Sequence, residues 1–187
     1  MIDLLSTLIN LEEDPVLHAS RLLVLLDIFR GTEETRIKGL TKVVKLDFLL
    51  RYPVYLERAL KAREAQSISN ILNIKEYERK SVESSMIRYR YGPWDHRYRA
   101  FINYLVSKGL ADVEVQIKPR QKTIYVGLTS KGIDLATKLE CNKDFEDIVI
   151  RSKILKRHFD KNAMWLERFI YDTFPEIGSM KMGETIV

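Results

Sequence analysis

The chain has 187 residues, of which 45% are hydrophobic and 30% are charged, and its formal net charge is +5. This composition is ordinary for a folded globular protein and excludes a disordered, collagen-like or disulfide-scaffold class. A single cysteine and three histidines exclude an intramolecular disulfide and a Cys/His zinc site, and they favour a cytoplasmic location.

The N-terminal part of the sequence predicts a layer of helices over residues 15–80, preceded by an arm at 1–14 without a signal peptide. Asp14 before Pro15 predicts a helix start and Gly31 its end. This helix has almost no polar face, so we expect it in the core. Its longest apolar run is too short to cross a bilayer. Further helices are expected at 40–50, with Thr41, Lys42 and Lys45 toward solvent, at 54–65 after Pro53, and at 71–79.

The segment 88–140 predicts a helix, a hairpin and a second helix. After a turn at Gly92 and Pro93, a helix is expected from Trp94 to Lys108, ended by Gly109, with apolar residues on one face. Alternating residues then predict a strand around 113–117, a turn at 118–122 and a strand at 123–128. Thr129 or Ser130 caps a helix through Leu139. This is the element order of a winged helix-turn-helix, in which the hairpin is the wing.

The C-terminal segment 141–176 predicts one long helix, from about Phe145 to Phe174, that a partner would cover in part. The tail, 177–187, has no periodic pattern and is expected to be mobile. The expected fold class is therefore α+β and mostly α. It consists of a winged helix-turn-helix with a two-stranded wing within 15–140, an N-terminal helical layer and a long C-terminal helix.

The basic excess of the chain lies between residues 88 and 122, a stretch that contains eight basic residues and only three acidic ones. Such a stretch indicates a surface that meets an anionic partner. Three wing cations can reach DNA phosphates, although they can also serve solubility and edge protection. The exposed face of the preceding helix is either a DNA-contacting face or an ordinary solvated one. The candidate DNA-binding residues are Lys118, Arg120, Lys122, His96, Arg99 and Asn103.

Alternating arginines and tyrosines before this helix suit a protein interface, because guanidinium groups bind carboxylates and tyrosines pack well. The candidate partner-binding residues are Arg88, Tyr89, Arg90, Tyr91 and Arg97. A metal-dependent nuclease centred on Asp95, Glu114 and Lys118 is a weaker hypothesis, since Asp112 and Glu114 belong to the solvated hairpin face. We expect no catalytic residue, cofactor or metal.

Several segments resemble a known family. They are residues 39–53 and 90–98, the pair Gly109 and Leu110, and the later group Leu128, Thr129 and Gly132. Together they resemble the middle component of ABC-three-component systems, and the small subunit of Lamassu-type anti-phage defence complexes is similar.

The resemblance implies a non-catalytic bridge between an SMC/Rad50-like ATPase and an effector, commonly a nuclease. The arginine and tyrosine cluster would then contact the ATPase heads, the effector, or double-stranded DNA held on the heads through its phosphates. No membrane is involved, and the resemblance supplies no catalytic residue. The alternative, from the element order alone, is a free-standing winged-helix transcription regulator.

Overall fold

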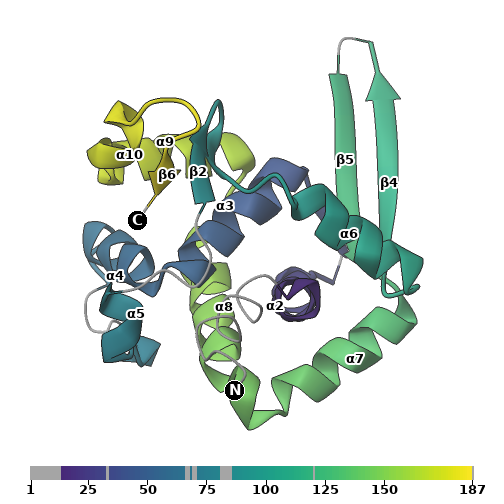
Figure 1. The fold of residues 1–187 in the computed structure, drawn as a ribbon. Coiled ribbons are helices and arrows are strands. Elements are labelled where there is room, and N and C mark those ends of the chain that lie inside the picture. The colour runs from purple at the N-terminus through teal and green to yellow at the C-terminus, as the bar shows by residue number, and fades with distance from the viewer. Residues whose placement is uncertain are drawn as a thin grey trace, which may run out of the picture.

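The computed structural model describes residues 14–32, 34–65, 68, 71–80, 86–119 and 121–186. The predicted arm up to residue 13 and the candidate Arg120 lie outside this part, as does the side chain of Lys118. The fold is α+β and mostly helical, with two small antiparallel sheets (Figure 1). Its helices are α2 (Pro15–Phe29), α3 (Leu40–Arg51), α4 (Pro53–Ala62), α5 (Glu76–Lys80), α6 (Tyr98–Ser107), α7 (Ser130–Glu140), the short 3-10 helix η2 (Lys143–Phe145), α8 (Glu146–Phe159), α9 (Ala163–Thr173) and α10 (Pro175–Ser179).

Helix α2 lies at the centre, as its apolar sequence predicts. The carboxylate of Asp14 accepts a hydrogen bond from the Val16 amide at 2.8 Å, and Pro15 occupies the first turn, so the predicted helix start is confirmed. The helix packs against α6, α7 and α8, which surround it in Figure 1. Helix α3 also contacts α2, and α4 follows it directly, with Pro53 in the first turn of α4. The predicted helix at 71–79 is shorter, since only Glu76–Lys80 is α-helical.

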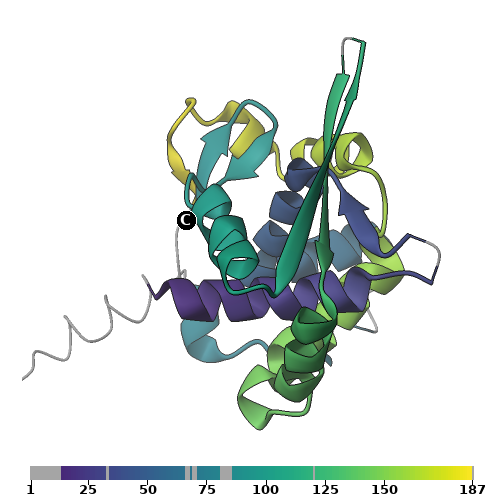
Figure 2. The same ribbon diagram turned by 90° about the vertical axis from the view of Figure 1, so that its right-hand side faces the viewer.

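The predicted hairpin is present and projects from the body, and we call it the wing. Strands β4 (Ala111–Lys118) and β5 (Gln121–Leu128) pair along their whole length and extend well beyond the helices (Figures 1 and 2). A third strand, β1 (Arg36–Lys38), was not predicted and pairs with the base of β5. The strand order is β1-β5-β4, so β4 is an edge strand.

A joint with close backbone contacts connects the wing to α7, and it explains why the sequence has glycine at 109 and 132 and threonine at 129. The Thr129 hydroxyl donates to the Gly109 carbonyl at 2.7 Å and accepts from the Gly132 amide at 3.1 Å, so Thr129 caps α7. Gly109 has a φ of +66°, which favours glycine. A Cβ on Gly132 would lie only 1.8 Å from the Leu110 carbonyl oxygen, so this contact requires glycine.

The second sheet corrects two predictions. Strands β2 (Met86–Tyr89), β3 (Gly92–Trp94) and β6 (Thr185–Ile186) form it in the order β3-β2-β6. Trp94 therefore ends a strand and does not start a helix, because its ring packs between those of Tyr89 and Tyr98. The tail is also ordered: Ile177 and Ile186 are buried, and the Tyr52 hydroxyl donates to the Ile186 carbonyl at 3.2 Å.

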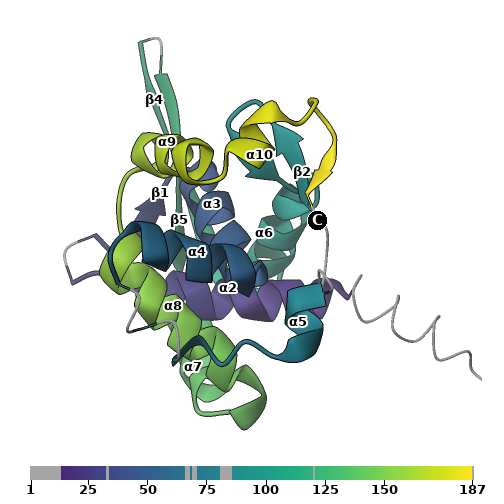
Figure 3. The same cartoon turned by 90° about the vertical axis from the view of Figure 1, so that its left-hand side faces the viewer.

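The predicted long C-terminal helix is wrong. The chain ends α8 at Phe159 and begins α9 at Ala163, where the Asn162 side chain caps the new helix by accepting from the Trp165 amide at 2.8 Å. The break lets α9 pack on α3 and α4 (Figure 3). The apolar residues of this segment are therefore covered largely by the chain itself, and they do not require a partner.

Candidate partner interface

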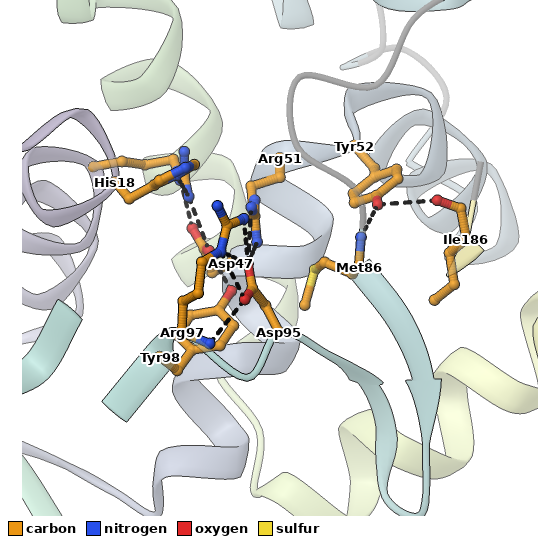
Figure 4. A network of polar contacts seen from close by, with 10 residues as sticks. His18, Asp47, Arg51, Tyr52, Met86, Asp95, Arg97, Tyr98 and Ile186 are labelled. Atoms are coloured by element: carbon orange, nitrogen blue, oxygen red, sulfur yellow. Dashed lines mark hydrogen bonds and ion pairs between the residues drawn. The ribbon is translucent and has the colours of Figure 1, made fainter. Parts of the chain in front are cut away.

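A buried network of arginines and carboxylates joins α2, α3 and the start of α6 (Figure 4). Arg21 donates to Asp47 at 2.7 Å, and the Tyr98 hydroxyl donates to the same carboxylate. Arg51 donates to Asp95 at 3.1 Å. Both carboxylates are almost fully buried. Neither was predicted to be part of a core network.

Electrostatics keep both acids ionised despite their burial. Burial raises the pKa of Asp47, but the charges of Arg21 and Arg51 outweigh this and lower it below its ordinary value. Burial and the neighbouring Asp47 raise the pKa of Tyr98, so its hydroxyl remains a donor. Such a network is costly to break, because removing one partner leaves the other buried and unpaired.

Asp95 also folds the turn that starts α6. Its Oδ1 accepts from the Arg97 amide at 2.9 Å, and the Arg97 guanidinium donates to the same carboxylate at 2.8 Å. Arg97, a candidate for partner binding, is thus engaged in a structural contact. The Asp95 carboxylate is bound by Arg51 and Arg97. Glu114, on the wing, instead accepts from Arg36 of β1 at 2.9 Å. These two carboxylates therefore lie in separate ion pairs, unlike the shared site that the nuclease hypothesis requires.

Acidification is expected to destabilise the fold through Asp95. Burial alone raises the pKa of this carboxyl group, but the hydrogen bonds from Arg97 and the charges of Arg51 and Arg97 lower it from 3.8 to about 2. Because the folded state has the lower pKa, the stabilisation is present above pH 3.8 and is lost as the pH falls toward 2. Urea denaturation across this window should show a shallower pH dependence for Asp95→Asn. An unchanged pH dependence would contradict this assignment.

The arginine and tyrosine cluster divides between the interior and the surface. The Arg88 backbone donates to Glu184 and accepts from Gly183, both at 2.8 Å, so this residue is tied to the C-terminal segment. Tyr89 and Tyr91 are each about half exposed, and the Arg90 guanidinium lies 5.4 Å from the Tyr91 ring. The tip of the β2–β3 hairpin is therefore the surface part of the predicted partner-binding cluster.

Two predicted DNA-binding residues, Arg99 and Lys122, line one groove beside the wing. The groove has a volume of about 940 Å³. It lies among the outer half of β5, the start of α3 and the turn between α8 and α9. The other two described candidates, His96 and Asn103, are exposed but are not among its lining residues. Five cations line the groove: Lys38, Lys42, Arg99, Lys122 and Lys161.

Most of these cations lack a counter-charge. Lys42 donates to Asp160 at 2.6 Å, and Glu34 is the other carboxylate of the lining, so the groove carries a net charge of +3. Within the described part of the chain, the remaining four cations form no ion pair. A groove with this potential attracts an anionic ligand.

The wing carries an exposed apolar strip next to this groove, which we define as Val113, Val115 and Ile117. These side chains are 39%, 44% and 80% exposed, respectively. Across the hairpin they face Val126, Ile124 and Lys122 in that order. The strip thus runs from the buried core at Val126 out to the wing tip, and Ile124 also lines the groove. The opposite face is polar, because Arg36 pairs there with Asp112 and Glu114.

Sequence reasoning missed the buried polar residues of α2 and α3. Lys45, expected in solvent, is 2% exposed, and its ammonium donates to the Ala163 carbonyl at 2.9 Å and to Glu167 at 3.0 Å. The sequence did contain one indication of this burial: Arg21 and Asp47 stand next to runs of apolar residues, in helices that have almost no polar face. Charged residues in such runs are buried only when paired.

Comparisons with protein-family models, curated protein sequences and solved structures find no significant match. Across the described residues, no helix has both the length and the apolar character needed to cross a bilayer. The same residues contain no group of three or more His, Cys, Asp or Glu side chains placed to bind a metal ion.

Proposed function

We propose that this chain is a non-catalytic bridging subunit of an SMC-like ATPase complex in anti-phage defence. In this role it links the ATPase heads, DNA and an effector nuclease in the cytoplasm. The observation that carries the proposal is the wing, which extends beyond the body and exposes Val115 and Ile117 on one face. An apolar strip that is exposed on a projecting hairpin is typical of a surface that binds another protein.

The identity of the partner comes from the resemblance to middle components of ABC-three-component systems. The residues that carry this resemblance lie in α3, in the β2–β3 hairpin and at the joint of Gly109, Thr129 and Gly132. Of these elements, α3 contacts β5 and the joint connects the wing to α7. The resemblance therefore concerns the scaffold that presents the interface, and the exposed strip supplies the contact itself.

The proposal predicts that an SMC-like ATPase is encoded beside this chain, and co-expression of the two proteins tests it. The two proteins should co-elute in size-exclusion chromatography, and Ile117→Glu should abolish co-elution because it places a charge in an apolar contact. Ile71→Glu is the matched control, since Ile71 is 55% exposed but lies away from the wing. Separate elution of the unmodified proteins, or a neighbouring gene for an unrelated protein, would contradict the proposal.

The second candidate function is a winged-helix transcription regulator that binds DNA directly. It is favoured by the convergence of Arg99 and Lys122 on one cationic groove. In that case the groove would contact phosphates, and the wing would lie along the duplex. The exposed apolar strip favours the bridging role, because DNA interfaces are more polar and more hydrated than protein interfaces.

A further inference from the structure

We infer that the cationic groove binds an acidic peptide segment that also carries apolar side chains, contributed by a partner protein. The inference rests on the proposed function and names the chemistry of the contact. The groove is the space between β5, the α3 start and the α8–α9 turn, with Arg99 and Lys122 at its wall.

The charges come from four separate parts of the chain. Lys38 lies on β1, Arg99 on α6, Lys122 on β5 and Lys161 in the turn between α8 and α9. The fold thus brings like charges together without ion pairs among the described residues. An acidic segment removes their mutual repulsion on binding, and complementary charge of this kind gives specificity and speeds association.

The groove also has apolar walls, which favour a peptide over a nucleic acid. They include Leu40, Ile124 and Met164, and the Met164 side chain is 72% exposed. The half-buried Trp94 lines the same space. A DNA phosphate backbone gains nothing from these surfaces, whereas leucine or isoleucine side chains gain about 25 cal/mol per Å² of apolar area buried.

The wing extends this site beyond the groove. Ile124 lines the groove and lies opposite Val115 in the hairpin register. A segment seated against Ile124 can therefore continue along the apolar wing strip. The volume of about 940 Å³ lies near the upper end of the roughly 300–1,000 Å³ usual for ligand sites. This space accommodates a short stretch of chain.

Selection from a library of short random peptides, displayed on phage and applied to the immobilised full chain, tests the inference. The enriched peptides should combine several Asp or Glu residues with Leu, Ile or Phe. In fluorescence anisotropy, an enriched peptide should bind the double variant Arg99→Glu/Lys122→Glu more weakly by about tenfold or more. The control Arg157→Glu/Lys143→Glu makes the same charge change at exposed residues outside the groove lining, and should retain binding within about twofold.

Circular dichroism and thermal melting establish that both double variants are folded, as expected for exposed positions. The inference is overturned if no peptide is enriched, if enriched peptides lack an acidic excess, or if both double variants bind equally. It is also overturned if a mixed-sequence duplex displaces the peptide and binds more tightly, which would support the regulator alternative.

Co-expression separates failure of this inference from failure of the proposed function. If Arg99→Glu/Lys122→Glu co-elutes with the ATPase as well as the unmodified chain does, the groove is not the contact and the bridging role stands. If acidic peptides bind in the groove but the unmodified chain and the ATPase elute separately, the groove assignment stands and the bridging role fails.

Discussion

Asp47→Asn is expected to lower the free energy of unfolding by about 3–5 kcal/mol. Asp47 is fully buried on α3, and it accepts from Arg21 on α2 and from Tyr98 at the start of α6. Asparagine keeps the shape of the side chain but removes its charge. The Arg21 side chain, 3% exposed, would then carry a buried charge without a counter-ion. Urea denaturation at neutral pH measures the loss.

Asp112→Asn is the matched control for this prediction. Asp112 also pairs with an arginine, Arg36, but both side chains are more than a third exposed. Exposed ion pairs contribute little to stability, since water screens them, so we expect a much smaller loss for Asp112→Asn. Equal losses for the two variants would show that the buried network contributes no more than a surface pair, contrary to our account of the core.

Gly132→Ala is expected to destabilise the protein by about 2–3 kcal/mol, although alanine is the better helix former. The new Cβ would lie 1.8 Å from the Leu110 carbonyl oxygen and 2.9 Å from its carbon. Because these are backbone atoms at the start of the wing, α7 must move away from the hairpin to relieve the contact. Calorimetry should show a lower melting temperature for this variant.

Gly178→Ala provides the comparison, since it makes the same change in another helix. There the nearest atom to a new Cβ is Cδ1 of Tyr171, at 3.6 Å, which is an ordinary contact. We expect a change within about 1 kcal/mol, with stabilisation favoured by helix propensity. A Gly132→Ala protein as stable as Gly178→Ala would refute the close approach of α7 to Leu110.

Local signals predicted those parts of the fold that neighbouring residues determine. Asp14 and Pro15 start α2, and Thr129 caps α7, because capping depends on side chains within a few residues. The alternation at 113–117 predicted a strand for the same reason. These features need no information from distant parts of the chain.

Features that depend on long-range contacts were not predictable. The helical pattern from Phe145 onward is continuous in sequence, but the chain breaks before Asn162 so that α9 can pack on α3. Trp94 fits a helical stripe, yet it forms a strand because β2 lies beside it. In each case tertiary packing outweighs a local preference.

The candidate site shows the same division. The sequence identified Arg99 and Lys122 as exposed cations, and both are exposed in the structure. It did not indicate that they share a groove with Lys38 and Lys161, because these residues come together only in the folded chain. Nor did it predict an exposed Ile117, since alternation predicts an apolar face without showing how far the hairpin projects.

Hydrogen exchange of the chain with and without the proposed ATPase partner tests the central claim most directly. The claim is that the wing and the adjoining groove form the contact surface. We predict slower exchange on ATPase binding at the amides of β4 and of β5 near Ile124, with little change in the α4–α5 region. Unchanged exchange in the wing, with protection confined to α4 and α5, would contradict the account.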